Sequence, residues 1–135
     1  MAKLLALHPL GQIFAFFCGL LALLIITTRK KSSIALHINF GLLYYLMAAL
    51  GFAIGVMMYS RSGRNYMPLW INIHQIIAVI VMILFGIGAG TGFLLLKKGR
   101  ELSNILRLHR FSNYLSMFSF VIQGIIGMRL FLNLQ

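Results

Sequence analysis

Four long, continuous apolar segments constrain this chain more than any other feature of its sequence. They lie at about 4–28, 34–59, 67–96 and 108–132. Each segment meets the roughly 20-residue length that a helix needs to cross about 30 Å of hydrocarbon. Of the 135 residues, 61% are hydrophobic and only 10% are charged, and a soluble domain of this size could not bury so much apolar surface. The sequence therefore predicts four membrane spans.

The pattern within and between these segments indicates the fold. Only helices and closed barrels satisfy every backbone hydrogen bond inside a bilayer. The segments are continuously apolar and do not alternate with a period of two, which excludes a barrel. The connections are short, so sequential helices should be antiparallel neighbours. We predict an all-α integral membrane protein that forms one domain over 1–135, an antiparallel up-down-up-down four-helix transmembrane bundle.

The basic residues lie at the ends of the apolar segments, so the net charge of +11 indicates membrane topology and lipid headgroups rather than nucleic acid. The first and third connections hold most of them: Arg29, Lys30, Lys31, Lys97, Lys98, Arg100, Arg107 and Arg110. The opposite side holds Lys3, Arg61, Arg64 and Arg129. This bias predicts that both termini are non-cytoplasmic, in a bacterial inner membrane or an organellar membrane.

Each predicted span has one histidine near its start: His8, His37, His74 and His109. Because consecutive spans run in opposite directions, His8 and His74 should lie at one depth, and His37 and His109 at the other. For any single histidine, an interhelical hydrogen bond or a proton-relay role is an equally good interpretation. Random placement would seldom pair all four by depth.

Paired histidines inside a helix bundle are what bis-histidine haems require. Haem iron takes two axial ligands on opposite sides of the ring, and neutral imidazole is a good one. Helices one and three are diagonal in an up-down bundle, as are helices two and four, so each pair would face across the bundle. At a rise of 1.5 Å per residue, the two irons would be about 20–25 Å apart. We predict two non-covalent b-type haems, an outer one on His8 and His74 and an inner one on His37 and His109.

Glycine and basic residues near each predicted haem have two readings. A wide macrocycle needs slim neighbouring helices, and glycines lie at the required depths: Gly19, Gly51, Gly55, Gly86, Gly88, Gly90, Gly92, Gly124 and Gly127. Close packing of helices is the alternative. The haem propionates could meet basic residues at each level: Arg61, Arg64 and Arg129 outside, and Arg29, Lys30, Arg107 and Arg110 inside. Topology signals are an equally good reading of these arginines, and Trp70 is most simply an interfacial anchor.

Four segments together resemble the cytochrome b561 family: His8-Pro9-Leu10, His37 with its following apolar helix, Asn72-Ile73-His74-Gln75, and Leu108-His109-Arg110 with the later Gly124 and Gly127. The resemblance implies a four-helix core with two b-type haems that pass electrons across the membrane, the four histidines being the iron ligands. Many relatives have six spans, whereas this sequence has four, and no ascorbate-binding motif is matched. The expected partners are lipid, a quinone or other small electron carrier, and redox protein subunits of a membrane oxidoreductase.

Two other functions stay open. One is a haem-free transporter or channel, although such proteins usually bring carboxylates into the membrane and Glu101 lies in a connection. The other is a membrane anchor for soluble redox subunits. The single cysteine, Cys18, lies within the first span, and no Cys-x-x-Cys-His motif exists, so covalent c-type haem attachment is excluded.

Overall fold

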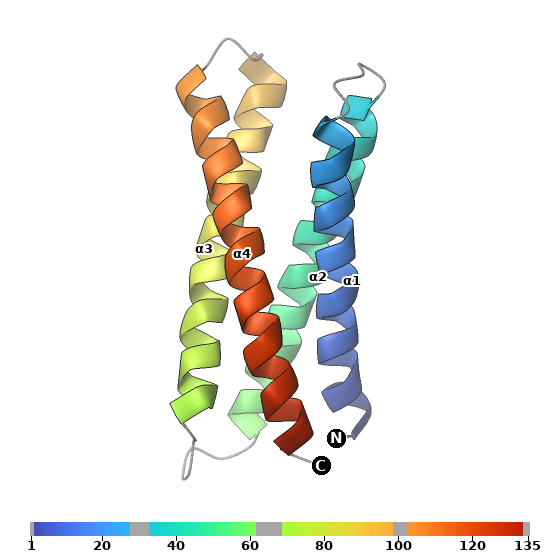
Figure 1. Ribbon diagram of the computed structural model, residues 1–135, viewed down its shortest axis with the longest axis vertical. Coiled ribbons are helices and arrows are strands. Elements are labelled where there is room, and N and C mark those ends of the chain that lie inside the picture. Colours follow the sequence, from blue (N-terminus) through green and yellow to red (C-terminus); the bar gives the residue numbers. More distant parts are fainter. Residues whose placement is uncertain (1, 28–32, 62–68, 99–102, 134–135) are drawn as a thin grey trace. The chain divides into compact units, whose positions relative to one another are not determined.

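The computed structural model describes residues 2–27, 33–61, 69–98 and 103–133, and all of them are helical (Figure 1). The helices are α1 (Ala2–Thr27), α2 (Ser33–Arg61), α3 (Leu69–Lys98) and α4 (Ser103–Asn133). All four are long and apolar enough to cross a membrane. The predicted all-α class is confirmed, and the chain is an integral membrane protein.

The predicted limits of the spans agree with the helices except at the start of α4. That helix begins at Ser103, whereas the apolar run predicts a start near 108. Residues 103–107 are continuous with the span in one helix. No glycine or proline interrupts residues 103–108, and serine is a good first residue for a helix. Residues 28, 67 and 68, at the predicted end of the first span and start of the third, lie outside the described residues.

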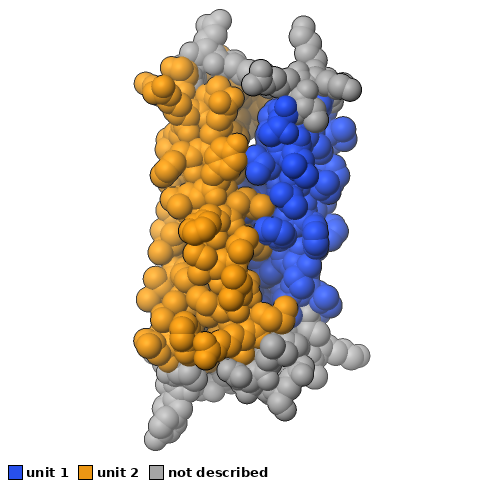
Figure 2. Space-filling view, in the orientation of Figure 1, with its two compact units in different colours: residues 1–67 blue, residues 68–135 orange. Residues whose placement is uncertain are grey.

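The helices form two compact units, which Figure 2 colours separately. The first hairpin, within residues 1–67, packs α1 against α2, and the second, within residues 68–135, packs α3 against α4. Each pair is antiparallel (Figure 1), because the start of one helix contacts the end of the other. His8, for example, bonds to Gly51 late in α2, and His37 bonds to Ala22 late in α1. The single domain over 1–135 stays a prediction.

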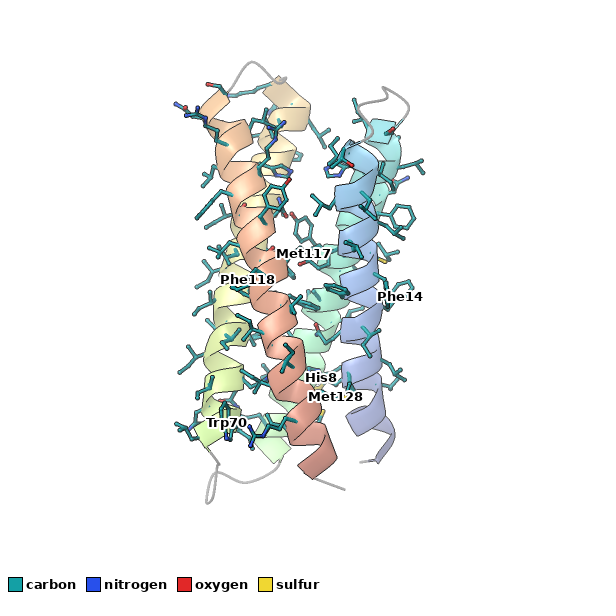
Figure 3. All side chains as sticks on the ribbon, viewed as in Figure 1. His8, Phe14, Trp70, Met117, Phe118 and Met128 are labelled. Carbon is teal, nitrogen blue, oxygen red and sulfur yellow. The ribbon has the colours of Figure 1, made fainter. Side chains whose placement is uncertain are left out.

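Side-chain exposure follows the demands of a lipid environment. Large apolar residues are widely exposed, including Phe14 at 49% and Phe118 at 65%, both labelled in Figure 3. The buried positions of the first hairpin carry mostly small side chains, among them Ala15, Cys18 and Ala48. Small residues let helix backbones approach closely, which is how helices associate when lipid solvates apolar groups as well as protein does.

Candidate functional site

His8 lies across the first hairpin, held by the end of α2. Its Nδ1 is 2.8 Å from the carbonyl oxygen of Gly51. A Cβ atom at Gly55 would be 3.2 Å from the Cε1 of His8, closer than ordinary van der Waals contact, so the imidazole packs directly against the glycine. One turn along α1, the side chain of Gln12 lies against Gly51 in the same way, and its amide donates to the Ala48 carbonyl at 3.5 Å.

His37 makes the corresponding bond at the other end of the first hairpin. It lies near the start of α2, and its Nδ1 is 2.9 Å from the carbonyl oxygen of Ala22, late in α1. Ala22 itself is buried, with 5% of its surface exposed. The small side chain lets the two helices come close enough for an imidazole on one to reach the backbone of the other.

His109 repeats the arrangement in the second hairpin with additional polar neighbours. Its Nδ1 is 3.0 Å from the carbonyl oxygen of Gly88 and 3.3 Å from the hydroxyl oxygen of Thr91, both on α3. The ring backs onto Gly92, where a Cβ atom would be 3.1 Å from Cε1. On α4, the Asn113 amide donates to the backbone oxygen of His109 at 2.7 Å. The Asn113 amide nitrogen also lies 3.4 Å from the Nδ1 of His109, so the imidazole has polar neighbours on both helices.

His74 lies near the start of α3 and packs against the end of α4. A Cβ atom at Gly127 would be 3.1 Å from the Cε1 of His74. The pairing of this ring with Gly127 matches those of His8 with Gly55 and of His109 with Gly92. Three of the four histidines are thus seated on a glycine of the neighbouring helix in their own hairpin.

The backbone bonds determine which ring nitrogen can bind a metal. A carbonyl oxygen only accepts, so the Nδ1 atoms of His8, His37 and His109 must donate their protons to it. In a neutral imidazole, the Nε2 atom then keeps its lone pair. Metal-bound histidines nearly always donate their second ring nitrogen to a carbonyl, carboxylate or water, which fixes the tautomer. These three side chains fit the role of axial haem ligands.

The two histidines of each hairpin lie at opposite ends of it. Along α1, His8 is about fourteen residues before Ala22, the acceptor for His37, which is a rise of about 21 Å. Along α3, His74 is about fourteen residues before Gly88, the acceptor for His109, giving the same rise of about 21 Å. Within one hairpin the two imidazoles are therefore far too distant to bind one metal ion.

The structure divides the glycines that the sequence grouped around a macrocycle. Gly55, Gly92 and Gly127 receive histidine rings from the partner helix, and Gly51 receives Gln12. These four serve close contact within a hairpin, which corrects the expectation that they make room for haem. At Gly86, Gly90 and Gly124, a Cβ atom would meet no described heavy atom within 4 Å. Those three remain available to face a bound group.

The arginines predicted near the haem propionates are placed only in part. Arg107 and Arg110 are exposed on α4, on either side of His109. The Arg61 side chain and Arg64 lie outside the described part of the chain. Arg129 lies with its guanidinium carbon 5.0 Å from the centre of the Trp70 ring, which gives this arginine an aromatic partner at the end of the second hairpin. Trp70 is labelled in Figure 3.

Sequence reasoning missed the groups that hold the histidines. Backbone carbonyls have no sequence signature, but the spacings Gly51-x-x-x-Gly55 and Gly88-x-x-x-Gly92 were a usable signal. In each, the first glycine gives the carbonyl and the second makes room for the ring. Thr91 was also missed, because a threonine inside an apolar helix usually bonds its own backbone.

Comparisons with known proteins add no identification. The chain matches no family model, no curated protein and no solved structure. The inference about function therefore rests on the residues and contacts described above.

Proposed function

We propose that this protein is a dihaem b-type cytochrome that carries electrons across a membrane. His8 and His74 would hold one haem, and His37 and His109 the other. The resemblance to the cytochrome b561 family supports this assignment. The propionates of the first haem would pair with Arg61 and Arg64, and those of the second with Arg107 and Arg110.

The observation that carries the proposal is the shared tautomer of three histidines. His8, His37 and His109 each donate from Nδ1 to a backbone carbonyl of the adjacent helix, at 2.8, 2.9 and 3.0 Å. Nε2 then carries no proton, which is the protonation state that an axial ligand needs. A histidine that only joined two helices would not require the same nitrogen to be used each time.

The distance between the two histidines of a hairpin indicates that each iron would take one ligand from each hairpin. Because the two histidines of a hairpin are about 21 Å apart along the helix, neither hairpin can supply both ligands of one haem. Two hairpins that each present a histidine at both ends can together supply two pairs. Two metal levels separated by about 21 Å suit a path for electrons from one face of the bilayer to the other.

When bound, haem supplies reversible one-electron chemistry, and the protein tunes it through ligands, burial and hydrogen bonds. A quinone dissolved in the bilayer is the natural small electron carrier, and peripheral redox subunits are the natural protein partners. The spans contain no aspartate or glutamate, which favours plain electron transfer over proton pumping. The same absence disfavours a haem-free transporter or channel.

A reduced-minus-oxidised absorption spectrum of the purified full chain tests the proposal. We expect sharp b-type bands and a pyridine haemochrome count of about two haems per chain. Protein produced with ample haem that shows no Soret band would contradict the proposal. A haem-free transporter or a membrane anchor for redox subunits would then be the better account of the chain.

A further inference from the structure

Thr91 gives His109 a second hydrogen-bond acceptor. This threonine lies in α3 with only 7% of its surface exposed, one turn after Ile87. Its Oγ1 is 3.3 Å from the Nδ1 of His109, which also lies 3.0 Å from the Gly88 carbonyl oxygen. Gly92, next in the chain, supports the ring from behind, with Cε1 3.1 Å from where its Cβ would stand.

The protons in this cluster can be assigned. A hydroxyl has one proton and two lone pairs. The Thr91 proton goes to the Ile87 carbonyl oxygen, the shortest of its contacts at 2.6 Å, rather than to the Gly88 carbonyl oxygen at 3.1 Å. The hydroxyl oxygen therefore faces His109 as an acceptor. The single Nδ1 proton of His109 is shared between this oxygen and the Gly88 carbonyl. The Asn113 amide nitrogen also lies 3.4 Å from this Nδ1, but it donates to the closer His109 backbone oxygen at 2.7 Å.

We propose that Thr91 is a positioning residue that lowers the reduction potential of the haem bound by His109. This inference rests on the proposed function. Acceptors on the second ring nitrogen of a histidine raise the basicity of the nitrogen that binds the metal. A more basic ligand favours the ferric over the ferrous state, and hydrogen bonding of this kind is one of the ways a protein sets a haem potential. The Thr91 hydroxyl thus lowers the reduction potential of one of the two haems.

The test is a spectroscopic redox titration of the full chain with haem bound. Thr91→Val removes the hydroxyl and keeps the branched shape, and Thr91→Ser keeps the hydroxyl. Thr27→Val is the matched control, because that hydroxyl also donates to its own backbone, at 2.6 Å from the Leu24 oxygen. We expect Thr91→Val to raise the midpoint potential of one haem only, the haem that His109→Ala removes. Thr91→Ser and Thr27→Val should leave both potentials in place.

A second measurement separates this inference from the proposed function. In haem-free protein labelled with ¹⁵N-histidine, Thr91→Val should move the Nδ1–H resonance of His109, assigned by its loss in His109→Gln. An unmoved resonance would overturn the contact whether or not haem binds. Bound haem with unchanged potentials in Thr91→Val would overturn the tuning alone. A wild-type chain that binds no haem would overturn the proposed function, and the tuning with it.

Discussion

Eleven residues after each histidine, the first hairpin has the buried residues Gly19 and Ala48, whereas the second has Phe85 and Phe120, whose rings stack. These positions correspond, since each residue lies about eleven positions after the histidine of its own helix. The two phenylalanine rings have their centres 6.2 Å apart and are inclined by 27°. At these positions one hairpin thus carries two small side chains, a hydrogen atom and a methyl group, and the other carries a pair of aromatic rings.

The difference shows that histidine placement does not depend on what fills the hairpin. The acceptors for His8 and His109 are backbone carbonyls, at Gly51 and Gly88, and every residue of a helix carries one. The requirement is a helix register that brings the carbonyl to the ring and a small residue that admits the ring. The middle of each hairpin is then free to vary with its packing.

The largest expected effect is the loss of one haem when a histidine is replaced. Which haem is lost should depend on the depth of that histidine in the membrane and not on the hairpin that carries it. His74→Ala should remove the outer haem and leave much of the inner one, and His8→Ala should produce the same spectrum although it lies in the other hairpin. His37→Ala and His109→Ala should share the opposite pattern. Haem counts and reduced spectra of the four variants check this. Equal loss of both haems in each variant would contradict independent sites.

A glycine substitution should reproduce the loss of a ligand without touching a histidine. Gly92→Val places methyl groups where the His109 ring lies, 3.1 Å from the glycine's missing Cβ. We expect the haem of His109 to be lost or its spectrum changed. Ala89→Val is the control three residues away on the same helix, because that side chain is exposed. Equal haem loss in both variants would show that the helix, and not the ring contact, was disturbed.

The aromatic pair should matter for stability and not for the histidines. Phe85→Ala leaves a cavity against Phe120, and we expect a loss of about 3 kcal/mol in the free energy of unfolding, the lower end of the range for such truncations. The control Phe118→Ala, at a position 65% exposed, should change it by less than about 1 kcal/mol. Equilibrium unfolding in mixed detergent measures both. If Phe85→Ala protein stayed folded but lost haem, the aromatic pair would be required for haem binding as well as for stability.

Much of the fold could be predicted because the apolar segments are long and four such segments follow one another. Helix type and number follow from the apolar segments, and only the start of α4 at Ser103 was misplaced, where polar residues continue a helix beyond the apolar run. Hydropathy detects only the part of a helix that lies in the hydrocarbon core of the membrane. The polar residues of a helix that continues beyond the core are therefore not recognised as helical.

The positions of the histidines near the helix starts could be predicted from the sequence, and their contacts could not. Counting spans pairs the histidines by depth, but it cannot reveal the backbone oxygen that each ring bonds. The glycines were assigned to the macrocycle for the same reason: Gly55 and Gly92 fit that role by depth, and only the helix register shows that imidazoles already occupy those positions. Thr91 depends on register in the same way.

The smallest expected effect concerns the end of the second hairpin, where Arg129 lies over Trp70. With Trp70 42% exposed, this cation–π contact should contribute about 0.5–1 kcal/mol, as measured by a double-mutant cycle of Arg129→Gln and Trp70→Leu. The sequence contains one tryptophan, so its fluorescence in Arg129→Gln reports the contact directly. Arg129→Lys should keep part of the coupling. A coupling of zero, with unchanged fluorescence, would leave Arg129 free to act as a topology signal or a propionate partner.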